Sequence, residues 1–437
     1  MVDNVVIGGG LAGMMAALQL ATHGQRVILI EQSDRLGGLA SSFERDGRLY
    51  PLGYHHILST DAHLLAQLAR LNLLDRVHWK HLDMGFSIDG TVHGLSAVSD
   101  WVKFPLPWLT KTRMAARVLS AWVPKHRDDE PANEWLERIA GSNAVQSFFD
   151  PLTQIKFGLP CSALSASWLR ARLQAGESGC MYGYMPDADW VSVLVDALHE
   201  CLRDAGVIIK LGTRARKLNF NKQQNRVTGV QTDDERLHTR SVVAALAPPI
   251  LEKLTDTVSD PLLASIEYTG VVSTVMATRQ RLPLDRYWTN FLRPNLSFGG
   301  IFRLDLLNDT LGHPGIRLLN FCTHVRDRSA GSMLRWKVDQ VEELYRADFQ
   351  RQFGMSITPE WSHTSQIQHY SPVFVHGYQN PPVRHGLLQN LFLAGNHRTF
   401  PVLATTGSAM GSGMEAATAA LNLLRNSPRT VEDFEAA

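Results

Sequence analysis

The chain opens with an apolar run that leads directly into a cluster of glycines. Residues 4–7 read Asn-Val-Val-Ile and are followed by the pattern Gly8-x-Gly10-x-x-Gly13. Residues 14–21 then carry apolar side chains at helical spacing. Because the β-branched run favours a strand, this order predicts a strand, a tight turn and a helix, which is the first half of a parallel βαβ unit.

Each glycine of this pattern has a physical task. Gly8 permits the sharp turn out of the strand, and Gly10 lets backbone N–H groups approach a pyrophosphate with no Cβ in the way. Gly13 allows the helix to pack closely on the sheet. The helix N-terminus then points its partial positive charge at the phosphates.

A second apolar run completes the unit and ends in an acid. Residues 26–30 read Arg-Val-Ile-Leu-Ile, and Glu31 follows them. A carboxylate at this position accepts hydrogen bonds from both ribose hydroxyls of a dinucleotide and repels a 2′-phosphate. A glycine-rich turn alone is weak support for a nucleotide site, but the flanking strands, helix and acid are all present here.

A glycine pair, Gly37-Gly38, follows Arg35 shortly after the acid. With these residues the chain resembles the flavoprotein group that contains amine oxidases, protoporphyrinogen oxidases, phytoene desaturases and UDP-galactopyranose mutases. The resemblance implies that the dinucleotide is FAD. No Cys or His stands where relatives attach FAD covalently, so we expect non-covalent binding.

The far end of the chain resembles the closing element of the same group. Residues 391–396 read Leu-Phe-Leu-Ala-Gly-Asn, and a small-residue helix is expected from about 406 to 424. The resemblance implies that Gly395 lies by the pyrophosphate or ribitol and that the helix N-terminus near Ser408 and Ala409 faces the flavin pyrimidine. Two residues depart from the pattern: Asn396 replaces an acid, and Ser408 replaces a glycine.

The middle of the chain supplies a third piece of the expected nucleotide domain. Residues 190–202 read as an amphipathic helix and 207–211 as a strand. The resemblance implies that Ala215 contacts the adenine through its backbone. We therefore expect an α/β fold in which a Rossmann-type FAD-binding domain is built from separated segments (1–80, 185–265 and 386–437), with a mixed α+β substrate-binding domain (81–184 and 266–385).

These motifs and their flanking residues define the expected cofactor contacts. They are Gly8, Gly10, Leu11, Ala12, Gly13, Glu31, Gln32, Arg35, Gly37, Gly38, Gly53, Ala215, Gly395, Asn396, Ser408 and Ala409.

A histidine pair is the first candidate for proton handling. In relatives a glycine of this region lies beside the flavin ring, and Gly53 matches it. His55 and His56 follow, and an imidazole can shuttle a proton near neutral pH. If the segment is a strand, adjacent side chains point to opposite faces and only one ring enters the cavity. The alternative is that one histidine caps a loop through backbone hydrogen bonds.

Three basic residues are further candidates. Lys156 lies in an apolar context before Phe-Gly, and Arg170 and Arg172 share a predicted helix. Any of them can bind an anionic group, although surface salt bridges are the commoner role of such residues. The strand expected at 271–278 contains no Lys, whereas polyamine oxidases usually have one there, which disfavours a simple amine oxidase.

The resemblance implies an FAD-dependent oxidoreductase of desaturase, dehydrogenase or oxidase type. It moves a hydride between a small molecule and flavin N5, and the aromatic residues of the substrate segments favour a bulky, hydrophobic substrate. Two alternatives stay open: a non-redox flavoenzyme resembling UDP-galactopyranose mutases or carotenoid isomerases, and a flavin-binding protein without catalysis.

Composition sets the remaining expectations. The net charge of +1 disfavours nucleic-acid binding, and the 4 Cys form no metal-binding pattern. We expect reduced thiols, no metal, no signal peptide and no spanning helix, and hence a cytoplasmic protein. Residues 101–127 interleave aromatic and basic side chains. This segment could contact a membrane surface peripherally or form a helical lid over the substrate cavity, and we favour the lid.

Overall fold

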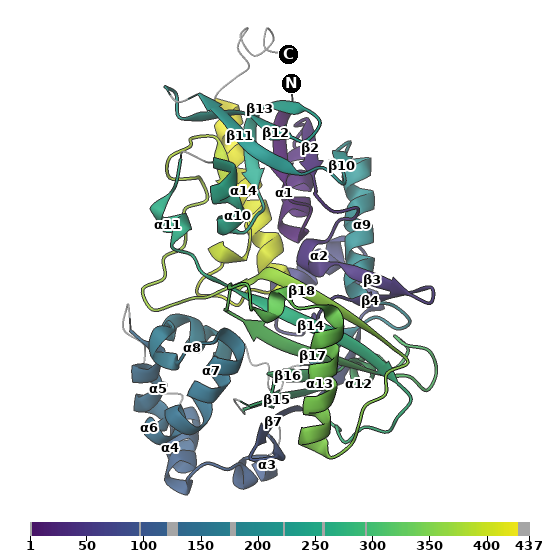
Figure 1. The fold of residues 1–437 in the computed structure, drawn as a ribbon. Coiled ribbons are helices and arrows are strands. Elements are labelled where there is room, and N and C mark those ends of the chain that lie inside the picture. Colours follow the sequence, from purple (N-terminus) through teal and green to yellow (C-terminus); the bar gives the residue numbers. More distant parts are fainter. Residues whose placement is uncertain are drawn as a thin grey trace.

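The computed structural model describes residues 2–95, 98–119, 130–174, 181–221, 223–255, 258–292 and 295–426. Two seven-stranded sheets organise these residues, with helices packed around each sheet (Figure 1). The first sheet lies in the upper part of the view, near both termini, and the second lies below it. The expected α/β fold class is confirmed.

The first sheet has the strand order β10-β2-β1-β13-β12-β11, and β19 also pairs with β13. Its parallel pairs are β10 with β2, β2 with β1, β1 with β13, and β13 with β19, whereas β12 is antiparallel to β11 and β13. The strands are β1 (Val2–Ile7), β2 (Val27–Ile30), β10 (Ile208–Lys210), β11 (Ala215–Asn221), β12 (Arg226–Thr232), β13 (Arg236–Ala244) and β19 (Leu391–Leu393).

Alternate residues of these strands enter two different cores. Val6 and Leu29 pack against helices α1, α2, α9 and α14, while Val5 and Ile28 pack against α10, α11 and the outer strands. Helices on both faces explain why the inner strands are continuously apolar. The helices are α1 (Leu11–Thr22), α2 (Ala62–Arg70), α9 (Trp190–Asp204), α10 (Pro248–Thr255), α11 (Pro261–Ala264) and α14 (Thr406–Asn426).

Two glycines allow very close packing around α1. A Cβ on Gly413 of α14 would lie 2.0 Å from the carbonyl oxygen of Ala12, and a Cβ on Gly13 would lie 1.9 Å from that of Gly8. No other residue type fits at such distances. The last described helix is thereby held directly against the first.

The second sheet has the order β18-β14-β17-β16-β15-β7-β8, and β15 with β7 is its parallel pair. Helix α13 (Val338–Phe353) covers one face through Tyr345 and Phe349, and an aromatic cluster packs on the other. The strands are β7 (Met84–Ile88), β8 (Thr91–Gly94), β14 (Tyr268–Thr278), β15 (Trp288–Phe291), β16 (Gly300–Arg303), β17 (Arg317–Val325) and β18 (Trp361–Pro372).

A helical cluster lies beside the second sheet, at the lower left of Figure 1. Its core contains Trp135, Phe148 and Trp168. The helices are α3 (Val98–Lys103), α4 (Trp108–Leu119), α5 (Ala132–Ala140), α6 (Ser142–Ala144), α7 (Asp150–Phe157) and α8 (Ala166–Gln174), with a π-helical turn at Val145–Phe149.

Short elements connect these parts. They are β3 (Ser42–Arg45), β4 (Arg48–Pro51), β5 (Ile57–Leu58), β6 (His78–His81), β9 (Met181–Tyr184) and α12 (Leu304–Leu307), with single 3₁₀ turns at Gly38–Ala40, Leu74–Arg76, Cys161–Ala163, Met333–Arg335 and Asn396–Arg398. The segments that supply each large sheet support the domain division proposed from the sequence, which stays a prediction.

Part of the segment expected to form a lid is described. Residues 120–127 lie outside the described residues, while α3 and α4 leave Val102, Trp108 and Leu109 exposed. Among residues 99–114, whose side chains are described, none lines the large cavity presented below, and the preferred lid stays a prediction. The helices of the described residues are too short or too polar to cross a bilayer. Membrane contact stays a prediction.

Candidate flavin and substrate site

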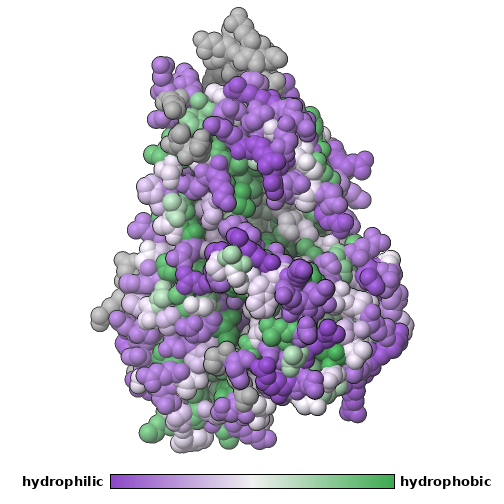
Figure 2. Space-filling model, viewed as in Figure 1, coloured by the Kyte–Doolittle hydropathy of each residue, from purple (hydrophilic) through white to green (hydrophobic). Residues whose placement is uncertain are grey.

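A cavity of about 990 Å³ lies between the two large sheets. We call the part walled by residues 8–12 and 31–44 the glycine-loop end, and the part walled by α7, α8, β15, β17 and β18 the aromatic end. Polar side chains dominate the face shown in Figure 2, and smaller apolar patches lie between them. Among the predicted site residues, those on the cavity wall are Gly8, Gly10, Leu11, Ala12, Glu31, Gln32, Arg35, Gly37, Gly38, His55, His56, Lys156, Gly395, Asn396 and Ala409.

Two glycine loops touch each other at the glycine-loop end. Gly10 bridges to Gly37, and a Cβ on Gly38 would lie 2.9 Å from the Cα of Gly10. A Cβ on Gly10 itself would find its nearest protein atoms at 3.8 and 3.9 Å. These are ordinary van der Waals distances to Gly38 and Gly37, so the two glycine loops together form a cradle whose main-chain atoms a ligand can approach closely.

Glu31 stands at the end of β2 and orders the first glycine loop. Its Oε2 accepts the backbone N–H of Gly9 at 2.7 Å, and its Oε1 accepts the backbone N–H and the hydroxyl of Ser33 at 2.9 and 2.7 Å. Each carboxylate oxygen has two lone pairs, so Oε1 is fully used and Oε2 can accept one further hydrogen bond.

We expect Glu31→Ala to weaken FAD binding at least tenfold. The change removes an acceptor for ribose hydroxyls and also leaves the N–H of Gly9 without its partner, and each charge-assisted bond is worth about 1.5–3 kcal/mol. The dissociation constant follows from quenching of flavin fluorescence on binding to apoprotein. Glu31→Gln is the control, because it preserves one oxygen acceptor and should lose less. Equal affinities in all three proteins would remove Glu31 from the proposed site.

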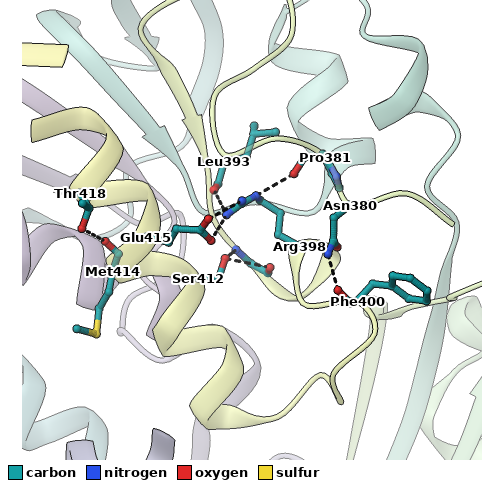
Figure 3. Close-up of polar contacts among 10 residues, drawn as sticks. Asn380, Pro381, Leu393, Arg398, Phe400, Ser412, Met414, Glu415 and Thr418 are labelled. Atoms are coloured by element: carbon teal, nitrogen blue, oxygen red, sulfur yellow. Dashed lines mark hydrogen bonds and ion pairs between the residues drawn. The ribbon is translucent and has the colours of Figure 1, made fainter. Parts of the chain in front are cut away.

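The C-terminal loop of the site is fastened to α14 (Figure 3). The backbone N–H of Gly395 donates to Oγ of Ser412 at 2.9 Å, and that hydroxyl donates to the carbonyl of Gly395 at 3.2 Å. Arg398 and Glu415 form a bidentate ion pair at 2.9 and 3.2 Å. These bonds fix the loop that presents Asn396, whose Oδ1 is buried with no hydrogen-bond partner among the described residues.

Four expected cofactor contacts do not lie on the cavity wall: Gly13, Gly53, Ala215 and Ser408.

The local structure around three of these residues shows what they do instead. Gly13 packs against the turn at Gly8, as its expected close-packing role requires. The Oγ of Ser408 accepts the N–H of Thr405 and donates to the carbonyl of Leu403, each at 2.8 Å, so it organises the turn before α14. Ala215 opens the edge strand β11.

The histidine pair lies in a loop between β4 and β5, which corrects the assumption of a strand there. The two rings therefore need not alternate, and both line the cavity. His55 Nε2 is 2.9 Å from the carbonyl oxygen of Leu39, the capping role left open from the sequence. His56 Nε2 is buried with no hydrogen-bond partner among the described residues.

Burial lowers the pKa of both histidines. For His55 the hydrogen bond to Leu39 partly opposes this effect. The pKa of His56 falls to about 3, first through burial and then through the charges of His55, Lys156 and Arg172. His56 is thus a neutral imidazole at pH 7, which can accept or donate a hydrogen bond.

Aromatic rings surround His56 at the aromatic end. Its ring centroid lies 5.4 Å from that of Tyr54, 5.2 Å from that of Tyr182 and 6.0 Å from that of Trp288. The sequence reasoning missed several wall residues of this end: Tyr54, Tyr268, His324, Tyr370 and Phe374. Except for Tyr54, which lies in the first FAD-domain segment, their signal was the aromatic richness of the substrate segments, since they come from elements far apart in the chain.

The wall meets the requirements of a dinucleotide cofactor. Gly10 leaves room for a pyrophosphate, Glu31 supplies a buried acceptor, and Asn396 and His397 carry buried polar atoms with no protein partner among the described residues. Buried polar atoms rarely remain unsatisfied in a native protein, so these atoms indicate a ligand. Fold and site together define a class of dinucleotide-binding proteins.

The sequence matches the family of flavin-containing amine oxidoreductases over residues 11–421. The chain belongs to this family of flavin-containing oxidoreductases, so the resemblance stated from the sequence is confirmed.

Curated relatives include 15-cis-phytoene desaturases of plants. The chain is 23% identical to the Arabidopsis thaliana protein over 283 residues, which is 57% of this chain and 48% of that protein. It is 23% identical to the protein of an Oncidium hybrid cultivar over 255 residues, 51% of this chain and 42% of that protein. The chain thus spans less than half the length of these two relatives.

Solved structures share the fold along nearly the whole chain. A provisionally named protoporphyrinogen oxidase from Exiguobacterium sp. 255-15 has a TM-score of 0.79 at 17% identity, covering 97% of this chain and 99% of its own. A reduced UDP-galactopyranose mutase has a TM-score of 0.74 at 14% identity, covering 97% of this chain and 96% of its own. Cyclohexylamine oxidase from Brevibacterium oxydans has a TM-score of 0.69 at 15% identity, covering 97% of this chain and 99% of its own.

Proposed function

We propose that the protein is a desaturase, dehydrogenase or oxidase that moves a hydride between a bulky, largely hydrophobic small molecule and flavin N5. One observation carries the proposal: a single cavity extends from the glycine loops to a chamber lined by aromatic side chains. Such a cavity brings a cofactor and an apolar substrate into contact and excludes water from both.

Chain residues at the glycine-loop end would hold FAD without a covalent bond. The backbone of Gly10 and Gly38 would face the pyrophosphate and Glu31 the ribose. Gly395 and Asn396 would face the ribitol, and the N-terminus of α14 at Ala409 would lend its partial positive charge to the flavin pyrimidine. When bound, FAD supplies an acceptor for hydride at N5.

The chain's own contribution to the reaction is orientation and proton handling. Rings such as Tyr54 and Trp288 would hold an apolar substrate in place. His56, neutral and unpartnered among the described residues, would exchange a proton with the substrate as the hydride moves. Lys156 was expected from the sequence to bind an anionic group; its Nζ lies 4.2 Å from the Trp288 ring centroid, and we assign it to substrate binding.

The substrate class is inferred from the wall and from the relatives. The wall at this end is dominated by aromatic rings, and β14 carries no Lys. The desaturases among the relatives are named for 15-cis-phytoene, a large compound. An isoprenoid, a tetrapyrrole or another bulky molecule therefore fits the proposal better than a small polyamine.

The test is anaerobic titration of the purified yellow protein with candidate compounds. We expect the flavin band near about 450 nm to bleach with a true substrate, because reduction removes the absorption of the oxidised ring. Product formation that requires chemically reduced flavin but leaves the flavin reduced would support a non-redox enzyme and overturn the proposal.

A further inference from the structure

We propose that the substrate carries an anionic group, a carboxylate or a phosphate, and that Lys156 and Arg172 bind this group at the aromatic end of the cavity. The inference rests on the proposed function, because it names the chemistry of the same substrate. It excludes amines, which two cations would repel.

Two cations from neighbouring helices line this end. Lys156 lies in the last turn of α7, and Arg172 lies on α8. The Nζ of Lys156 is 4.2 Å from the Trp288 ring centroid, and Cζ of Arg172 is 5.9 Å from that of Trp168. An aromatic face attracts a cation and fixes its position, so both charges are held at the wall.

The two cations act on the same part of the cavity. His56 and His324 approach it from different elements, a loop of the N-terminal region and β17. Lys156 and Arg172 each lower the pKa of both rings, in addition to burial. Lys156, Arg172, His56 and His324 all line the same cavity, so the charge of the pair acts on the space that these histidines border.

Acidic residues lie elsewhere on the wall. Among the described wall residues, the acids are Glu31, Asp34, Glu44 and Asp61. The first three belong to the glycine-loop end and the fourth caps α2. The described wall of the aromatic end therefore carries an excess of positive charge, the arrangement that favours an anion.

A neutral donor completes the site. His324 Nδ1 is buried and has no hydrogen-bond partner among the described residues. An imidazole N–H can donate to a carboxylate or phosphate oxygen, while the surrounding rings of Phe157, Trp168 and Phe374 cover an apolar body. The site therefore fits an amphipathic acid with its charged head between α7, α8 and β17.

The test uses FAD-loaded protein and four probes that share one chain and differ in the head group. Dodecanoate, dodecyl phosphate, dodecanol and dodecylamine are titrated below their aggregation limits, and binding is followed by calorimetry and by perturbation of the flavin spectrum. We expect at least one acid to bind roughly tenfold or more tightly than the alcohol, the size of one charge-assisted hydrogen bond. Comparison of the two acids identifies the preferred head group.

Variants locate the effect. Lys156→Met and Arg172→Met should each reduce the preference for acids and leave dodecanol binding within about twofold, whereas Lys156→Arg should retain the preference. Lys80→Met and Arg170→Met are matched controls. The Nζ of Lys80 also lies over an aromatic ring, 4.7 Å from the ring centroid of Tyr184, and Arg170 lies on α8 together with Arg172. Neither Lys80 nor Arg170 lines the cavity.

Acids that bind no better than the alcohol, or a preference that survives both methionine variants, would overturn the inference. Failure of the proposed function is distinguishable: a flavin that no compound reduces would leave the preference for acids intact. If neutral compounds reduce the flavin and the protein shows no preference for acids, the proposed oxidoreductase function stands and the anion site is wrong.

Discussion

Replacing Gly10 by valine is expected to give a folded, colourless protein. Gly10 has φ −71° and ψ 172°, a conformation open to any residue, and its Cβ position has no protein atom nearer than 3.8 Å. A Cβ is therefore tolerated in the apoprotein, and we expect the larger valine side chain to project into the space proposed for the pyrophosphate. We expect at least a hundredfold loss of FAD affinity, about 2.8 kcal/mol.

The measurement is flavin content after reconstitution, together with circular dichroism and thermal unfolding of the apoproteins. Wild-type protein should be yellow and release intact FAD on heating. Gly13→Ala is the contrasting control, because its Cβ would lie 1.9 Å from the carbonyl oxygen of Gly8 and should damage the fold itself. A yellow Gly10→Val protein, or FMN or NAD in place of FAD, would contradict the proposed binding mode.

Replacing His56 by glutamine should abolish most substrate-driven flavin reduction while FAD stays bound. General acid–base groups typically contribute 10²–10⁴-fold, and His56 is the member of the pair whose Nε2 has no protein partner among the described residues. His55→Gln should instead lower thermal stability, because the ring contacts the carbonyl of Leu39. Stopped-flow reduction rates and melting temperatures separate the two roles.

The pH dependence provides a second check on His56. Because its pKa is lowered to about 3, the ring stays neutral well below the usual range of histidine. The kcat/KM profile, which reports the free enzyme, should show no acid limb from this group down to about pH 5. A bound anion would raise the pKa of His56. The acid limb of the kcat profile, which reports the enzyme–substrate complex, should therefore lie at a higher pH than that of the kcat/KM profile. Wild-type rates in both glutamine variants would remove the pair from the mechanism.

The glycine-loop end could be predicted from the sequence because its determinants are local. Gly8, Gly10 and Glu31 belong to one unit of about thirty residues whose strands and helix are specified by neighbouring side chains. The family resemblance then located the C-terminal loop, including Gly395 and Asn396. Tertiary packing alone could show that Ser408 and Ala215 lie off the cavity wall.

The aromatic end could not be assembled from the sequence, because its residues meet only through tertiary packing. Lys156, Trp288 and His324 come from a helix and two strands, and no sequence periodicity links them. The assumption of a strand at the histidine pair failed for a local reason: the chain leaves β4 at Pro51 and turns before β5. Chemical candidates were visible in the sequence, but their partners were not.

The position of β13 has a consequence for biosynthesis. It lies between β1, which starts at Val2, and β19, which starts at Leu391, so the sheet lacks a strand until the ribosome has made nearly all of these residues. At typical elongation rates the apolar edge at Val242 and Val243 stays unpaired for on the order of 10 s. Unpaired edges of this kind favour aggregation, so we expect the nascent chain to be prone to aggregation until β19 pairs with β13. Bound FAD, seen as yellow colour, would then mark the molecules that completed the sheet.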